Sequence, residues 1–150
     1  DNARKINATL EAINPAATQD IIPLGRMDSM LQARDKLDEG YLVGMLADRG
    51  LGDDATVDCD FLGKPAPFPL GPFRMAAMLR RPVFFMTGLY LGGNRYQLHF
   101  EPIADFSQTT REERDTAIHA AMQHYADRLT HYCRLAPYNW FNFFDFWQKK

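Results

Sequence analysis

Residues 41–47 form an uninterrupted apolar run, and this run constrains the possible folds of the chain more than any other segment does. Such a run, bounded by turn residues on both sides, is typical of a strand buried on both faces of a sheet. A shorter apolar run of strand length, residues 20–24, comes before it, and a helical pattern lies between them. Strand, helix and strand with short joints predict a right-handed parallel crossover. We therefore expect an α/β fold with a mixed, mainly parallel sheet flanked by helices.

The helical pattern between these two runs has clear start and stop signals. Asp28 or Ser29 is suited to cap its beginning, and Gly40 is well placed just after its end. Met30, Leu31, Arg34 and Leu37 are expected on one face of this helix.

A β-hairpin is predicted further along the chain. Residues 83–91 and 95–103 are rich in β-formers and are joined by Gly92-Gly93-Asn94. In the second run three apolar residues alternate with Arg95, Gln97 and His99, so we expect one face of the hairpin to be in water. The three apolar residues are Tyr96, Leu98 and Phe100.

The longest helical pattern covers residues 109–134. Thr110 and Glu113 have the spacing of a capping box at its start. One face of this helix carries Ile118, Met122, Tyr125 and Leu129. Before the hairpin, four prolines within residues 61–72 predict a rigid irregular loop, and residues 73–79 predict a short helix with Met75, Ala76 and Leu79 inward.

Composition excludes several classes of protein. A chain of 150 residues that is 46% hydrophobic is suited to a single globular domain. Its net charge of -2 argues against a dedicated nucleic-acid binder. No apolar run approaches the roughly 20 residues that span a bilayer. Two cysteines, Cys59 and Cys133, favour a reducing compartment, and Cys133 lies in a helical pattern typical of a buried thiol.

Neither a metal site nor a cofactor site is expected. His124, Asp127 and His131 share a helical face but lack a metalloprotease spacing, so we interpret them as a solvent-facing stripe. Nucleotide-binding glycine motifs and a serine nucleophile elbow are missing from the sequence. The acidic residues Asp53, Asp54, Asp58 and Asp60 are interpreted as a solvated loop, since they lack the calcium-loop pattern.

Charged residues at the ends of the two predicted parallel strands are candidates for a site. Asp48 and Arg49 follow residues 41–47, and Arg26 follows the earlier strand. Ligands bind at the carboxyl ends of strands in open α/β sheets. The acidic Asp48 and the basic Arg49 are therefore suited to orienting a catalytic group or holding a phosphate. A structural ion pair between Arg26 and Asp48 explains the pattern equally well, and both interpretations stay open.

Seven of the nineteen aromatic residues lie near the end of the chain: Tyr138, Trp140, Phe141, Phe143, Phe144, Phe146 and Trp147. A helical period does not place them on one face, so they cannot all pack against a single surface. A wall of an acyl pocket or a membrane-interface belt is one interpretation. A tail that completes the core is the other, and the two are compatible.

Several short segments, in their order and spacing, resemble a known family. They are residues 40–50 (GYLVGMLADRG), 61–66 (FLGKPA), 71–76 (GPFRMA), 81–83 (RPV) and 137–141 (PYNWF). They are similar to the carboxyl-terminal half of the lysophospholipid-type acyltransferases, and most of all to the bacterial lipid A late (lauroyl/myristoyl) acyltransferase branch. The resemblance implies that residues 1–150 are the carboxyl-terminal part of a single acyltransferase domain with a glycerolipid-acyltransferase-like α/β/α fold. Asp1, which starts within a helical pattern and is not methionine, fits a piece of a longer parent protein.

The resemblance also implies an enzymatic role. Family members use a His-x4-Asp or His-x4-Glu motif whose histidine deprotonates the acceptor hydroxyl. The histidines here are His99, His119, His124 and His131, and none has an acid at the required spacing. The catalytic base is therefore expected upstream, which leaves no catalytic residue in this chain and predicts that it is inactive by itself. Arg26, Asp48 and Arg49 are implied to bind the acceptor's phosphate or polar head.

The implied reaction moves a fatty acyl group from acyl carrier protein or coenzyme A to a hydroxyl of a lipid or glycolipid. It uses no cofactor, and its parent protein is expected at the cytoplasmic face of the bacterial inner membrane, with peripheral membrane contact. Trp140, Phe141 and Phe144 are the expected acyl-pocket or membrane contacts. The isolated chain is expected to be soluble, and its oligomeric state stays open. The alternative is a non-catalytic lipid-binding, acyl-binding or oligomerisation module that uses the aromatic tail.

Overall fold

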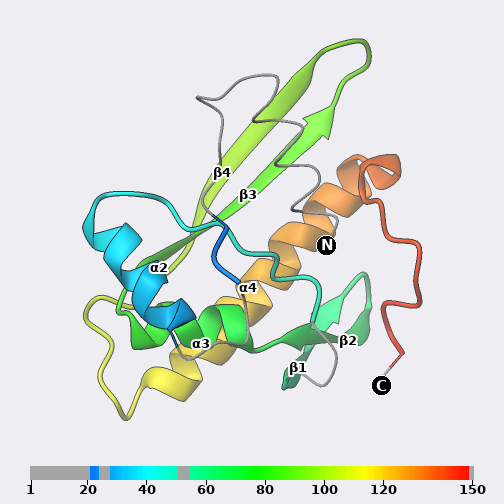
Figure 1. Cartoon of the computed structure of the whole chain (residues 1–150). Coiled ribbons are helices and arrows are strands. Elements are labelled where there is room, and N and C mark those ends of the chain that lie inside the picture. The colour runs from blue at the N-terminus through cyan, green and yellow to red at the C-terminus, as the bar shows by residue number, and fades with distance from the viewer. Residues whose placement is uncertain (1–20, 24–27, 51–54, 149–150) are drawn as a thin grey trace. The chain divides into compact units, whose positions relative to one another are not determined.

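The computed structural model describes residues 21–23, 28–50 and 55–148 of the chain (Figure 1). The Cα positions divide the chain into two compact units, residues 1–43 and residues 44–150, and each is described by itself. Within the described ranges, no helix combines the length and the apolar character needed to cross a membrane.

Unit 1 contains helix α2 (Ser29–Asp38), as the helical pattern predicts. The helix ends where Gly40 adopts a φ of 88°, a left-handed conformation that favours glycine. The amide of Tyr41 donates to the Lys36 carbonyl (3.0 Å) and that of Gly40 to the Leu37 carbonyl (3.1 Å), which together form a Schellman motif. Gly40 as the residue after the helix is therefore confirmed. Leu31 from the expected helical face is exposed, however, and Ala33 is the buried apolar residue of this helix.

The expected parallel sheet is wrong. Residues 41–47 and the described part of the earlier run, residues 21–23, form no strand. Of the apolar residues in the longer run, Tyr41, Leu42 and Leu46 are exposed. A strand exists only where a neighbouring strand pairs its N–H and C=O groups, and in the described residues the strands pair locally as antiparallel hairpins. The fold is mixed α/β, as expected, but the described residues form two small antiparallel sheets.

The first hairpin of unit 2 consists of β1 (Thr56–Phe61) and β2 (Lys64–Pro69). It replaces the irregular loop that the prolines predict. Its two-residue turn has positive φ at both Leu62 (52°) and Gly63 (89°), which is the geometry of a type I′ turn. Pro65, Pro67 and Pro69 are therefore in a strand, and Pro72 lies in the first turn of the helix that follows.

The register explains why the prolines are tolerated. Pro65, Pro67 and Pro69 lie opposite Asp60, Asp58 and Thr56. A two-residue turn makes the closing pair exchange hydrogen bonds, so the alternate pairs that contain proline have their backbone groups turned away from the partner strand. No ladder hydrogen bond is lost, and β2 is accepted as an edge strand. The other face of this hairpin buries Cys59, Phe61, Ala66 and Phe68.

The second hairpin is confirmed, and each strand end lies within two residues of its predicted position. It pairs β3 (Pro82–Tyr90) with β4 (Tyr96–Asp105) around a turn that contains Gly92 and Gly93. Its orientation is unusual, because the apolar side chains of β4 face the solvent. Tyr96, Leu98 and Phe100 are exposed, whereas His99 and Glu101 are partly buried.

The register again gives the reason. Phe85 lies opposite Glu101 and Leu89 opposite Gln97, and cross-strand partners share a face. Phe85 and Leu89 are buried, so the polar residues of β4 are carried to the same inner side. Because β3 has apolar residues on both faces, its sequence does not decide which one is buried.

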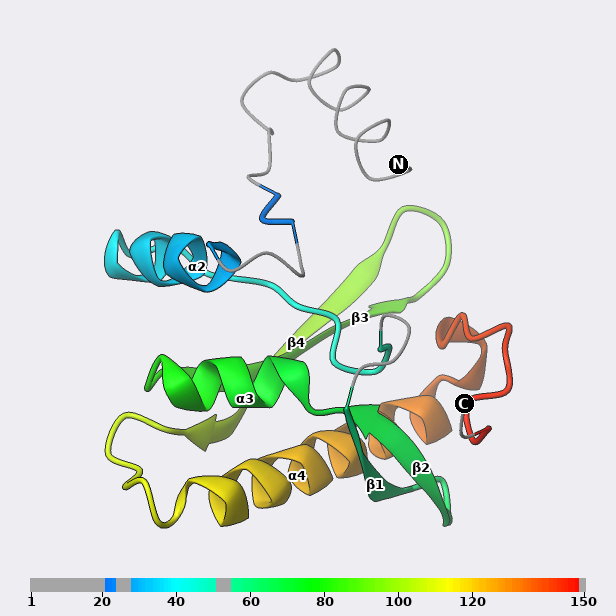
Figure 2. The same cartoon turned by 60° about the horizontal axis from the view of Figure 1, so that its bottom comes forward.

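Helix α4 (Arg114–Leu135) is the centre of unit 2, and it contacts α3 (Gly71–Met78), both hairpins and the short 3-10 helix η2 (Pro137–Asn139) (Figures 1 and 2). Thr110 and Glu113 exchange the hydrogen bonds of a capping box, but the helix begins four residues after Thr110. The predicted inward residues Ile118, Met122 and Leu129 are buried. In α3 the buried residues are Phe73 and Ala77, while Met75, Ala76 and Leu79 are half-buried.

Polar side chains of α4 hold the first hairpin in place. The Asp60 amide donates to Gln123 Oε1 (2.9 Å), and Gln123 Nε2 donates to the Asp60 carbonyl (3.1 Å). These are the backbone groups that Asp60, opposite Pro65, turns away from β2. The Leu62 amide at the turn donates to Thr130 Oγ1 (3.2 Å). The helix thus satisfies backbone groups at the free edge of β1.

Candidate functional site

Asp48 and Arg49, two of the three predicted head-group residues, form an ion pair in unit 2. Arg49 Nε lies 3.7 Å from Asp48 Oδ2. The Asp48 side chain is only 15% exposed, whereas that of Arg49 is 47% exposed. Burial raises the pKa of the Tyr125 hydroxyl in the middle of α4, and the Asp48 carboxylate raises it further. The pair therefore has one largely covered carboxylate and one half-exposed guanidinium.

Arg49 also joins this pair to the aromatic tail. Its Nη2 donates to the Phe141 carbonyl across 3.4 Å, a long and therefore weak hydrogen bond. Asp48 and Arg49, the implied head-group residues, thus lie close to Phe141, an expected acyl or membrane contact that is far away in sequence. Arg26, the other predicted head-group residue, lies outside the described residues, so neither its ligand role nor its ion pair with Asp48 is tested.

The aromatic tail divides into a buried part and an exposed part, as its lack of a helical period predicts. Trp140, Phe146 and Trp147 surround Phe61, with ring centroids 5.1–5.8 Å from it. Phe141 and Phe143 are 65% and 91% exposed, and Phe144 is also exposed. The tail therefore completes the core with one set of rings and presents another set to the solvent. Trp140, an expected acyl or membrane contact, belongs to the first set, and Phe141 and Phe144 belong to the second.

The helical histidine stripe and the acidic residues near β1 face the solvent in the described part of the chain. His124, Asp127 and His131 are exposed, as expected, and Asp58 and Asp60 lie on the exposed face of strand β1 rather than in a loop. Asp53 and Asp54 lie outside the described residues. Across the described part of the chain, no three His, Cys, Asp or Glu side chains are grouped to hold a metal ion.

Both cysteines are buried thiols, as predicted for Cys133. Burial raises the pKa of Cys59 and of Cys133 to about 11, and nearby carboxylates add to the rise. At neutral pH both are therefore protonated, which makes them poor nucleophiles.

A polar network that the sequence does not predict lies beneath the second hairpin. Glu101 of β4 accepts hydrogen bonds from Arg128 and Tyr132 of α4, and Arg128 also forms an ion pair with it. These contacts hold the pKa of Glu101 below its ordinary value. The ring of His99 lies 4.8 Å from that of Tyr132. The alternation of polar and apolar residues in β4 was the available signal, but it predicts the opposite face as the buried one.

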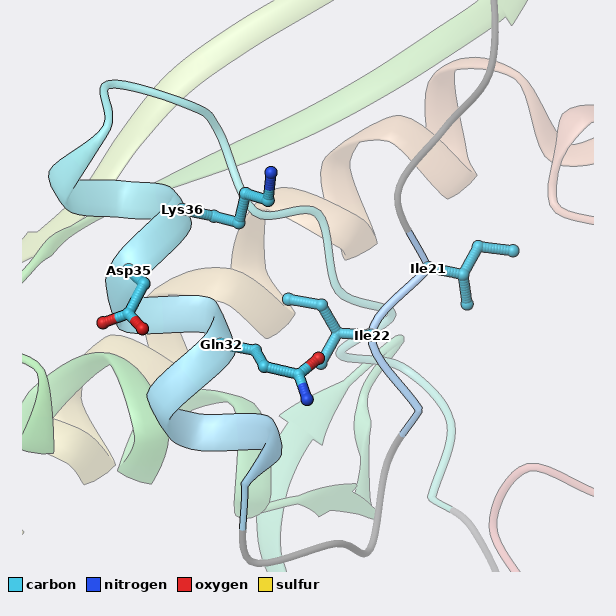
Figure 3. A pocket seen from close by; sticks show the side chains of 5 residues that line it. All are labelled: Ile21, Ile22, Gln32, Asp35 and Lys36. Carbon is cyan, nitrogen blue, oxygen red and sulfur yellow. The ribbon is translucent and has the colours of Figure 1, made fainter.

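Unit 1 contains a pocket lined by Ile21, Ile22, Gln32, Asp35 and Lys36 (Figure 3). Ile22 and Gln32 point toward one another, whereas Ile21 points away. The charged lining residues already have partners, because Asp35 pairs with Arg34 (2.9 Å) and Lys36 with Glu39 (3.6 Å). We assign this pocket no function.

Comparison with known protein families places the chain among the acyltransferases. It belongs to the bacterial lipid A biosynthesis acyltransferase family, whose family model matches residues 16–149. The match includes Arg26, Asp48, Arg49 and the whole aromatic tail, and it confirms the family suggested by the short segments. No match was found among curated proteins or solved structures. Membership implies an acyl donor and a lipid acceptor in general terms.

Proposed function

We propose that this chain is part of an enzyme that moves a fatty acyl group from acyl carrier protein or coenzyme A to a hydroxyl of a lipid or glycolipid. The observation that carries the proposal is the family match over residues 16–149. In the reaction the acceptor hydroxyl gives its proton to a general base, and its oxygen attacks the thioester carbonyl. The ester forms, the carbon–sulfur bond breaks and the thiol leaves with a proton.

The general base is assigned to residues of the parent protein upstream of this chain. Within the printed sequence, no histidine is followed by an acid at the His-x4-Asp/Glu spacing. The role of this chain is therefore to bind the acceptor and to hold the acyl chain. The parent protein is proposed to act at the cytoplasmic face of the bacterial inner membrane, where its lipid acceptor would be available.

Asp48 and Arg49 are proposed to form the polar end of the acceptor site, together with Arg26. The half-exposed guanidinium of Arg49 is suited to a phosphate, since its planar donors match phosphate oxygens. The less exposed Asp48 fixes the orientation of Arg49 and is a positioning residue. Phe141, whose carbonyl accepts from Arg49, adds an exposed aromatic ring beside this cation. A cation beside an apolar ring has the chemistry that an amphipathic lipid requires.

This proposal predicts the behaviour of three variants of the parent protein. Arg49→Ala should raise KM for the acceptor, and Asp48→Asn should lower kcat/KM by about a hundredfold, because a misplaced binding group costs that much. Arg49→Lys should recover only part of the loss, since lysine cannot form a bidentate contact. Steady-state acyl transfer with a varied acceptor measures these effects.

Arg111→Ala and Asp115→Asn are matched controls, because both residues are exposed and lie outside the site. They should leave the kinetic constants unchanged. Wild-type transfer by the Arg49 and Asp48 variants would assign the ion pair a purely structural role.

The alternative, a non-catalytic lipid-binding, acyl-binding or oligomerisation module, is favoured by one observation. Tyr138, Phe141 and Phe143 are exposed on the tail, beyond what a completed core needs. Assays of the isolated chain distinguish this function from the enzymatic one.

A further inference from the structure

The outer face of the β3–β4 hairpin is an unusually large apolar surface. Its large side chains, each 46–66% exposed, are Phe84, Met86, Tyr90, Tyr96, Leu98 and Phe100. At roughly 150–250 Å² for each aromatic side chain, together they present on the order of 600 Å². That equals or exceeds the largest apolar patch of a typical monomer, so this outer face is expected to contact something apolar.

The residues of the outer face lie next to one another across the hairpin. Met86 lies opposite Phe100, Gly88 opposite Leu98 and Tyr90 opposite Tyr96. A Cβ atom placed on Gly88 would be 3.2 Å from Leu98 Cδ2, so the leucine side chain extends over the glycine. Leu98 thus covers the backbone of Gly88, and the apolar surface continues across both strands.

Arginine residues lie at both ends of the hairpin, whereas Glu101, in the middle of β4, lies on the inner face with Phe85. Arg80 and Arg81 precede β3 at one end, and Arg95 precedes β4 at the other. The carboxylate of Asp105, at the first end, accepts a hydrogen bond from the Ser107 amide (2.9 Å). The hairpin ends are therefore rich in arginine although the whole chain has a net charge of -2.

We propose that this outer face docks on an anionic lipid surface. Apolar side chains would enter the boundary between headgroups and acyl chains, and the arginines at both ends would meet lipid phosphates. Tyr90 and Tyr96, whose rings lie 5.3 Å apart beside Arg95, fit the headgroup level where tyrosine is enriched. A protein interface needs about one hydrogen bond per 100–200 Å², and the side chains of this face offer only the two tyrosine hydroxyls.

The tip of the hairpin also contacts the segment from which the aromatic tail begins. The Tyr90 amide donates to Asn139 Oδ1 (2.6 Å), which ties the tip of the hairpin to η2. Tyr138, the neighbour of Asn139, is exposed. The proposal rests on the proposed function, because a lipid acceptor is what would bring the protein to such a surface.

Vesicle flotation of the 150-residue chain tests the proposal. Binding to phosphatidylglycerol-rich vesicles should exceed binding to phosphatidylcholine vesicles and should weaken in high salt. The double variant Met86→Glu/Leu98→Glu should lower vesicle partitioning by about tenfold or more, because it places two carboxylates in the docking face. The double variant Met78→Glu/Leu135→Glu changes the same residue types at exposed positions outside that face, so it should bind as the wild type does.

Circular dichroism should show that both double variants are folded, since all four residues are exposed. Equal vesicle binding by the wild type and Met86→Glu/Leu98→Glu would overturn the proposal, as would a wild type that ignores anionic vesicles. A wild-type dimer in light scattering that this variant dissociates would assign the face to a second copy and would also overturn it. Loss of acyl transfer in Arg49 variants of the parent protein, which needs no vesicle, tests the proposed function separately.

Discussion

At the scale of single residues, Phe61 links the two ends of unit 2. It is fully buried in strand β1, and its ring contacts Phe68 of β2. It also contacts three rings of the tail, those of Trp140, Phe146 and Trp147. Without Phe61 these tail rings would lose the side chain around which they pack, so the tail is part of the core rather than an appendage.

Phe61→Ala is expected to destabilise the protein by about 3–5 kcal/mol, the usual cost of removing a buried aromatic ring. Phe143→Ala, at a residue that is 91% exposed, should change the free energy of unfolding by less than about 0.5 kcal/mol. Urea unfolding measures both. If Phe61→Ala were as stable as the control, the tail would not be packed on this hairpin.

At the scale of elements, the β3–β4 hairpin shows how far pattern recognition reaches. The strands and the glycine turn follow from local sequence, because β-formers and positive-φ residues act over a few positions. The buried face does not, since Phe84 and Phe85 are equally apolar and only packing against α4 selects Phe85. The same selection turns Glu101 inward, where Arg128 and Tyr132 satisfy it.

Glu101 should make stability depend on pH. Hydrogen bonds from Arg128 and Tyr132 lower its pKa in the folded state, so its ionised form stabilises the fold. This contribution is fully present above the unfolded pKa and is lost as the pH falls through the lower folded pKa. Glu101→Gln should therefore lower stability at neutral pH, and the difference from the wild type should shrink below about pH 4, near the ordinary pKa of glutamate.

Urea unfolding midpoints between neutral and acidic pH measure this difference. Asp105 and Glu113 also have lowered pKa values, because Ser107 and Thr110 donate hydrogen bonds to them. The wild type will consequently lose stability in acid for several reasons. The comparison with Glu101→Gln isolates one of them, and a constant difference at every pH would contradict the role given to Glu101.

The proline-rich segment is the element that sequence reasoning missed. Closely spaced prolines predict a loop because each lacks an N–H donor. Their spacing of two residues is compatible with an edge strand, because it places every missing donor on the side away from β1. Proline content alone does not show where the partner strand lies.

At the scale of the whole molecule, family membership and the missing catalytic motif make a joint prediction. The purified 150-residue chain should transfer no acyl group from acyl carrier protein or coenzyme A thioesters, because the proposed base is not in its sequence. Radiolabelled acyl transfer measures this. Turnover by the pure chain would contradict the proposed division of roles.

The isolated chain also separates the two proposed functions. Saturable fatty-acid binding that weakens in Phe144→Ala, with no transfer activity in the parent protein, would favour the non-catalytic module. Transfer by the parent protein that depends on Asp48 and Arg49 would favour the enzyme.

The sequence by itself determined the family, the long helix α4, the end of α2 at Gly40 and the existence of the β3–β4 hairpin. These depend on local preferences and on the order of short segments, which the chain carries in its printed residues. The tertiary structure alone decided that residues 41–47 form no strand, which face of the hairpin is buried, and that Arg49 contacts Phe141. Each of these three features depends on a segment that is distant in sequence. Burial and hydrogen bonding need two contacting partners, so neither partner's sequence determines them alone.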